Sequence, residues 1–430
     1  MRVFVLALSV SLLITQAEAN PLDRMEAVPG DWHGPTFKPS FSFPTTPPTA
    51  DVHPWEAISF RSEPQRYLAA ALAYVLEGQD RTNWRAQDNK VRRWFHMPWM
   101  GPGTRGREFI HGLTRERDFA PGELGSSQTA CRQNWALAFY NPTGAYVLGR
   151  IWNGVKRGAA PDLSRLPFPG GTVVAKLVFT EATADDTPLL AGAPELQANI
   201  HIGSGGTGPI CPDAAAARRA PRRLRLIQFD VAIKEKRGDY KTGWVFASFI
   251  YDGRKPGNDP WAKLEPLGLM WGNDPFLSDA DAAAGAKPIE SLVLADLGLG
   301  HALGRGGRMN GVVDERSSAC SSCHMASQWP TAAHMVPSSA TWAEAKCWFR
   351  NLDARYPFGL EPGDRAKCAD LAPTGAMVPL DFSLQLAIGL RNWSLAHTIH
   401  GVVRRTALGR LRRDGDRLTV NEVPSIELRR

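Results

Sequence analysis

Alternation of apolar and polar side chains predicts four β-strands in the middle of the chain. The clearest lies at 224–233, where the apolar positions fall on one face and the polar positions on the other. The apolar positions are Ile227, Phe229, Val231 and Ile233, and the polar ones are Gln228, Asp230 and Lys234. The other three strands are expected at 172–180, 196–202 and 244–251. Because no helical pattern separates these runs, they predict an antiparallel sheet or sandwich rather than a parallel βαβ unit.

Helical periodicity appears on the amino-terminal side of these strands. Apolar residues at helical spacing predict an amphipathic helix that begins after Ser62 as its N-cap and is closed by Gly78. Between this helix and the strands, residues 84–152 are rich in Trp, His, Met and Gly and have no clean period. This stretch is therefore predicted to consist mainly of loops.

Helical patterns return on the carboxyl-terminal side. Thr341 and Glu344 have the spacing of a capping box, and Asp381 is the expected N-cap of a helix that extends to Trp393. The predicted fold class is therefore α+β, with a β-rich antiparallel domain followed by an α-helical domain.

Shifts in composition predict the domain boundaries. Residues 1–19 have the features of a signal peptide cleaved after Ala19, with a basic start, a short apolar run and small residues at the cleavage site. The segments expected after it are a Pro-rich arm at 20–54, a β-rich domain at 55–297, a helical domain at 298–400 and a basic tail at 401–430. Export to the periplasm is the expected localisation, and it favours paired cysteines.

Net charge and the length of apolar runs each exclude one class of protein. Fifty Lys and Arg against 43 Asp and Glu give a net charge of +7, which is a mild excess and not the basic stripe of a nucleic-acid-binding protein. After the amino-terminal segment no apolar run reaches about 18 residues, so no integral membrane span is expected.

The strongest chemical signal is a C-x-x-C-H motif formed by Cys320, Cys323 and His324, which is the attachment signature of c-type haem. Two thiols one helical turn apart suit the two vinyl-derived carbons on one edge of the macrocycle, and the adjacent imidazole is placed to bind iron. The export signal and the lack of a second C-x-x-C weigh against a thioredoxin-like disulfide or a zinc site. One covalently bound haem c is predicted.

Residues 298–393 resemble a class I cytochrome c domain through this motif, the helical pattern after it and a methionine, Met377, shortly before the last helix. The resemblance implies that His324 and Met377 are the two axial iron ligands. The competing candidates for the sixth ligand are Met325, His334, Met335, His397 and His400. An open sixth position is a further alternative.

The four remaining cysteines allow three pairings. We expect Cys131 to pair with Cys211 and Cys347 with Cys368, because this choice keeps each bond inside one predicted domain.

The amino-terminal portion resembles a family of exported bacterial monohaem c-type cytochromes, through segments 96–100, 106–114 and 268–275. The resemblance covers most of the chain after the arm and implies no substrate. The expected function is single-electron transfer to a redox partner protein.

Two other functions remain open at this point. One is a haem-linked oxidoreductase whose β-rich domain binds a small organic substrate or a second metal. The residues that suggest a copper site are His96, Met97, Met100 and His111, and Glu108 with His111 has the spacing of an acid–base pair on a helix. The other is a haem-based sensor with an open iron position.

Overall fold

The computed structural model describes most of the chain between residues 22 and 410. The described residues are 22–23, 25–49, 52–100, 107–202, 211, 219–235, 237, 241–295, 297–298, 303–330, 341–353 and 377–410, without the side chains of 343–344 and 398–410. The predicted signal peptide and the end of the basic tail lie outside them.

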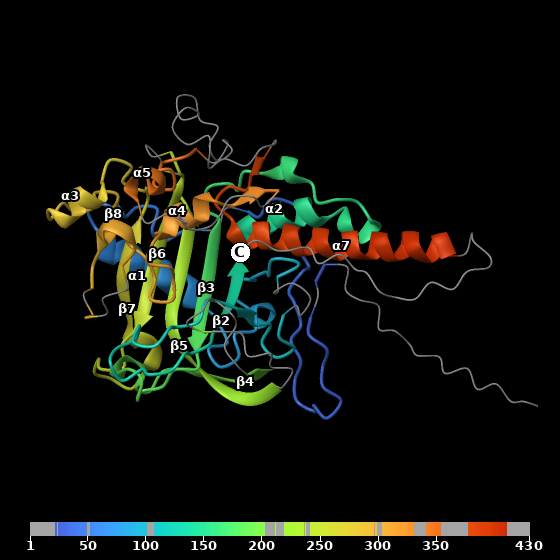
Figure 1. Ribbon diagram of the computed structural model, residues 1–430, viewed down its shortest axis with the longest axis horizontal. Coiled ribbons are helices and arrows are strands. Elements are labelled where there is room, and N and C mark those ends of the chain that lie inside the picture. Colours follow the sequence, from blue (N-terminus) through green and yellow to red (C-terminus); the bar gives the residue numbers. More distant parts are fainter. Residues whose placement is uncertain are drawn as a thin grey trace, which may run out of the picture.

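An eight-stranded antiparallel sheet forms the centre of the molecule (Figure 1). Its strands are β1 (Thr114–Arg115), β2 (Asn134–Tyr140), β3 (Val173–Thr180), β4 (Glu195–His201), β5 (Arg219–Lys234), β6 (Trp244–Tyr251), β7 (Leu264–Met270) and β8 (Ser291–Val293). They follow the order β1-β2-β3-β5-β6-β7-β8, and β4 pairs with the first half of β5. The four predicted strands correspond to β3, β4, β5 and β6. All four lie in this one sheet, so the predicted antiparallel sheet is confirmed.

Helices cover the sheet and extend beyond it. They are α1 (Pro64–Leu76), α2 (Pro142–Trp152), α3 (Asp279–Ala283), α4 (Cys320–Met325), α5 (Trp342–Ala345) and α7 (Leu384–Arg410). A small second sheet pairs β9 (Gln328–Trp329) with β10 (Val378–Pro379). In the described part of the chain, no helix is both long enough and apolar enough to cross a membrane.

The first helix is confirmed with a shifted start. Its N-cap is Glu63, whose side chain makes no capping hydrogen bond, and not Ser62. Pro64 begins the helix because its ring fixes a helical φ and it has no N–H to satisfy. Gly78 has a φ of +70°, the left-handed conformation that closes helices.

Both faces of the sheet pack against other parts of the chain. Alternate residues of β5, among them Phe229 and Val231, pack in one hydrophobic cluster with Tyr67 and Val75 of α1. The opposite face contributes to a second cluster that contains residues of α2, α4 and α7. Its sheet members include Tyr140, Trp244, Phe246 and Met270, and its carboxyl-terminal members include Met325, Met377 and Leu386. The polar side of β5 therefore lies beneath the carboxyl-terminal part of the chain and not in solvent.

The prediction that 84–152 is mainly loop is wrong for its second half, which contains β2 and α2. Six of the seven residues of β2 are buried, so its sequence lacks the alternation of a half-exposed strand. The start of α2 is set by Asn141, whose side chain accepts a hydrogen bond from the Gly144 N–H at 3.1 Å.

Candidate haem-attachment site

The C-x-x-C-H motif occupies α4. This helix lies over β6 and β7, on the face of the sheet that carries Trp244, Phe246 and Met270. The His324 ring contacts the Phe246 ring with centroids 4.6 Å apart. The Ser321 N–H lies 3.3 Å from the sulfur of Met270, the cross-strand partner of Phe246. The helix is thus fixed by the pair of strands beneath it.

Neither cysteine of the motif is in a disulfide bond, and both residues are partly buried. Cys320 and Cys323 stand one turn apart on α4. The surrounding protein raises the pKa of Cys323 to about 12 by desolvation, followed by the charge of Asp314. Desolvation likewise raises the pKa of Cys320. Both groups are therefore thiols at neutral pH, unlike the thiolate of a reactive cysteine.

The His324 side chain is held in one tautomer. Its Nδ1 lies 2.8 Å from the backbone carbonyl oxygen of Phe382. Because a carbonyl oxygen only accepts, Nδ1 carries the proton and Nε2 keeps its lone pair. Burial lowers the pKa of His324 to about 4, so the ring is neutral at neutral pH. A neutral imidazole whose second nitrogen is anchored in this way is the usual state of a metal-binding histidine.

The loop that precedes α4 is fastened to the sheet by Gln228. The Gln228 amide oxygen accepts from the Val313 N–H at 2.9 Å, and its nitrogen donates to Asp314 at 3.1 Å. A side chain at Gly311 would meet this amide and the Asp314 carboxylate, so their close approach favours glycine at this position. Gln228, on the polar face of β5, therefore holds in place the loop that leads into α4.

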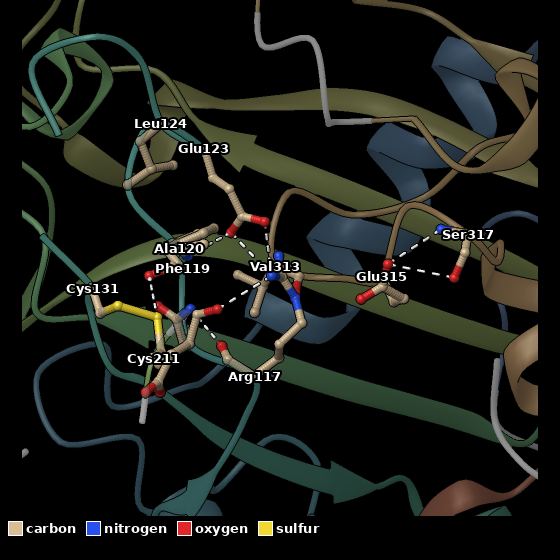
Figure 2. Close-up of polar contacts among 12 residues, drawn as sticks. Arg117, Phe119, Ala120, Glu123, Leu124, Cys131, Cys211, Val313, Glu315 and Ser317 are labelled. Carbon is tan, nitrogen blue, oxygen red and sulfur yellow. Dashed lines mark hydrogen bonds and ion pairs between the residues drawn. A yellow bond between two sulfur atoms is a disulfide. The ribbon is translucent and has the colours of Figure 1, made fainter. Parts of the chain in front are cut away.

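A second link connects this loop to the disulfide region (Figure 2). Arg117 donates to the Val313 carbonyl at 2.9 Å and to the Glu123 carboxylate at 2.9 Å. The predicted disulfide between Cys131 and Cys211 is confirmed, with a Cα–Cα distance of 6.0 Å. The S atom of Cys211 lies 3.6 Å from the carbonyl oxygen of Phe119, two residues after Arg117. The disulfide thus lies against the segment from which Arg117 reaches the loop.

Cys347 is also disulfide-bonded. Its predicted partner, Cys368, lies outside the described residues. That pairing stays a prediction.

Three polar side chains form a row across the sheet beside α4, and they were not predicted to belong to the site. Lys176, Asp230 and Ser248 are cross-strand neighbours on β3, β5 and β6. Asp230 accepts from the Ser248 hydroxyl at 2.7 Å and from the Gln228 amide at 2.8 Å. Desolvation and the negative charge of Asp314 raise the pKa of Asp230 to about 7, although Lys176 acts in the opposite direction. A carboxyl group that titrates near neutral pH therefore lies close to the motif.

Replacing this carboxyl, as Asp230→Asn, is expected to change how stability depends on pH. The folded-state pKa of about 7 exceeds the usual value for aspartate of about 3.9, so the folded protein loses stability as pH rises from about 4 through 7. Each unit of pKa corresponds to about 1.4 kcal/mol. Urea unfolding between about pH 5 and pH 7 should show at least that much loss in the native protein and a flatter profile in the variant. Parallel profiles would contradict the raised pKa.

The candidates for the sixth ligand occupy different environments. Met377 is buried next to β10, which pairs with the strand that directly follows α4, and belongs to the same cluster as Met325. His397 is exposed on α7, where its ring contacts Trp393 at 4.6 Å. His334 and Met335 lie outside the described residues, as does the side chain of His400. Met377 stays the predicted ligand.

Met377→Ala is expected to remove the sulfur-to-iron charge-transfer band of the oxidised protein, because alanine has no sulfur to bind the iron. The absorbance spectrum of the purified oxidised variant provides the measurement. Met325→Ala serves as the control, since this residue follows His324 directly and cannot reach the opposite side of the ring. An unchanged band in Met377→Ala would eliminate Met377 as a ligand.

The two histidines proposed for copper have other polar partners. His96 is buried, and its Nδ1 accepts from the Ser40 N–H at 2.9 Å. His111 is partly buried, and its Nε2 lies 2.8 Å from the Gln197 carbonyl oxygen. Among the described residues, no three His, Cys, Asp or Glu side chains are grouped to hold a metal ion. Glu108 pairs with Arg219 and not with His111. The acid–base pair is therefore not formed, because this segment turns instead of forming a helix.

Comparison with known proteins adds no relative. The chain matches no protein-family model, no curated protein and no solved structure. The interpretation of the site therefore depends on the geometry of its own residues.

Proposed function

We propose that this protein is an exported monohaem c-type cytochrome that transfers single electrons through one covalently bound haem. The observation that carries the proposal is the state of His324, whose Nδ1–H is bound to the Phe382 carbonyl at 2.8 Å while Nε2 remains available to iron. The two free thiols of Cys320 and Cys323 stand on the same short helix. This donor set fits haem c.

Each residue of the motif has a distinct role. Cys320 and Cys323 would hold the macrocycle through thioether bonds, and His324 would bind the iron through Nε2. Haem c supplies a one-electron Fe(III)/Fe(II) couple. Phe246 and Phe382 form an apolar wall beside the imidazole, with ring centroids 6.4 Å apart, and they lower the polarity on that side of it. Lower polarity around the iron is one of the means by which a protein sets its potential.

The sulfur chemistry of the rest of the chain supports export. Cys131 and Cys211 are joined in a disulfide, and such bonds persist mainly in oxidising compartments. The bacterial periplasm is an oxidising compartment, and we propose that the protein is located there. A redox partner protein is the proposed recipient of the electron.

A haem-linked oxidoreductase is the second candidate, favoured by one observation. Asp230 lies beside the motif with a pKa of about 7, which is the value expected of a general acid or base at neutral pH. The proposed substrate class is a small organic molecule that would give a proton to the Asp230 carboxylate and one electron to the oxidised haem.

The test is a set of measurements on the full chain, produced in a host that attaches haem to exported C-x-x-C-H sequences. We expect a pyridine haemochrome spectrum of the c type, haem retained on a denaturing gel and one iron per chain. The Cys131→Ser/Cys211→Ser variant should keep its haem, which would exclude this pair as the point of attachment. A protein with no covalent haem would refute the proposal. Turnover of an organic reductant that is lost in Asp230→Asn would favour the oxidoreductase.

A further inference from the structure

A strained turn carries the hydrogen-bond acceptor of His324. Asp381 and Phe382 have positive φ angles of 48° and 63°, and the Ser383 N–H donates to the Leu380 carbonyl at 3.0 Å. Left-handed backbone is costly for a residue with a side chain, above all for one as bulky as Phe. Two such residues in succession persist only where surrounding contacts hold them.

The Asp381 carboxylate provides those contacts. One oxygen accepts from Nζ of Lys234 at 2.6 Å and from the indole N–H of Trp244 at 2.9 Å. The other oxygen accepts from the backbone N–H of Phe168 at 2.8 Å. The carboxylate is 1% exposed, and its partners come from β5, from β6 and from the segment before β3. It therefore ties the turn to two strands of the sheet and to the segment before β3.

We propose that Asp381 is a positioning residue for the axial histidine. It holds the turn in the conformation that points the Phe382 carbonyl at Nδ1 of His324, and this inference rests on the proposed attachment of haem. A strong hydrogen bond from Nδ1 gives the imidazole more anionic character and makes it a stronger ligand. A stronger ligand of this kind stabilises Fe(III), so Asp381 keeps the reduction potential low.

The first readout is the hydrogen bond itself. In the reduced, diamagnetic holoprotein, NMR follows exchange of the His324 Nδ1 proton with solvent deuterium. We expect exchange to be at least about tenfold faster in Asp381→Ala, which lacks the carboxylate, because each 1.4 kcal/mol of lost hydrogen-bond stability is about a factor of ten. Asp381→Asn should restore part of the protection, since Asn tolerates left-handed backbone and keeps an acceptor oxygen.

The second readout is the reduction potential, and it needs variants that separate positioning from simple charge. Trp244→Phe removes one hydrogen bond to Asp381 without changing any charge. Lys234→Met removes a positive charge, which alone would lower the potential, whereas a loosened turn would raise it. We expect the potential to rise in Trp244→Phe. A tenfold change in the reduction equilibrium would correspond to about 59 mV for one electron.

Asp274→Ala is the matched control. Asp274 also has a φ of 48° and is 4% exposed, and its carboxylate accepts from the N–H of Ile289 at 2.7 Å and of Glu290 at 3.1 Å. Its loss should destabilise the protein but leave the Nδ1 exchange and the potential unchanged.

The results distinguish failure of the proposed function from failure of the proposed role of Asp381. Absence of covalent haem in the native chain would refute the proposed function. If haem is bound, unchanged Nδ1 exchange in Trp244→Phe and Lys234→Met would overturn the role of Asp381, even if Asp381→Ala fails to fold. Faster exchange in both, with no change in Asp274→Ala, would support it.

Discussion

The Cys320→Ala/Cys323→Ala variant is expected to lose all covalently attached haem. These are the free thiols among the described residues, and they stand one turn apart on α4, so no other thiol in this part of the chain is placed to replace them. Each single variant should keep one thioether and show a haemochrome band shifted toward that of unattached haem. Intact mass, which should fall by one haem in the double variant, provides the measurement. Retention of haem by the double variant on a denaturing gel would contradict the assignment.

Arg308→Ala is expected to lower the free energy of unfolding by about 4 kcal/mol or more, because the side chain is fully buried and four backbone carbonyls depend on it. The guanidinium donates to the carbonyl oxygens of Asn273, Asp274, Leu277 and Arg305 at 2.8 to 2.9 Å. It also lies 4.3 Å from the centre of the Phe349 ring. Urea unfolding of the purified variant would measure the loss.

Two further variants test the reason for this effect. Arg308→Lys should restore little, since an ammonium group has three donors and cannot reproduce the planar set of contacts. Arg254→Ala should cost less than about 1 kcal/mol, because Arg254 is 49% exposed and its pair with Asp252 is screened by water. Equal losses in Arg308→Ala and Arg254→Ala would contradict the explanation.

The sequence predicted those elements whose signal is local. The strands β3, β4, β5 and β6 were found because their residues alternate in polarity or form short apolar runs between turns. By contrast, six of the seven residues of β2 are buried, which removes the alternation. The small strand β8 has three residues and is too short to carry a pattern.

The candidate site divides in the same way. Contiguous residues encode haem attachment, so Cys320, Cys323 and His324 could be identified from the motif alone. The acceptor of the His324 proton is a backbone carbonyl, which has no sequence signature.

The prediction that Asp381 caps the last helix is wrong. Its carboxylate instead binds Lys234 and Trp244, which lie 147 and 137 residues earlier in the chain. The cap is Ser383, whose hydroxyl accepts from the Leu386 N–H at 3.1 Å. Local spacing cannot distinguish these two roles for an aspartate two residues before a serine, because tertiary partners decide between them.

The order of strands in the sheet has a consequence for how the protein is made. Nearly every strand pairs with its neighbour in sequence, with β4 as the side branch, and pairing between near neighbours closes small loops and folds quickly. A chain that emerges amino terminus first can therefore complete β1 to β8 before α4 and α7 arrive. The thiols of α4 then reach a preformed surface. If haem is attached as we propose, the interval before they dock is the time in which a maturation enzyme would have unhindered access to them.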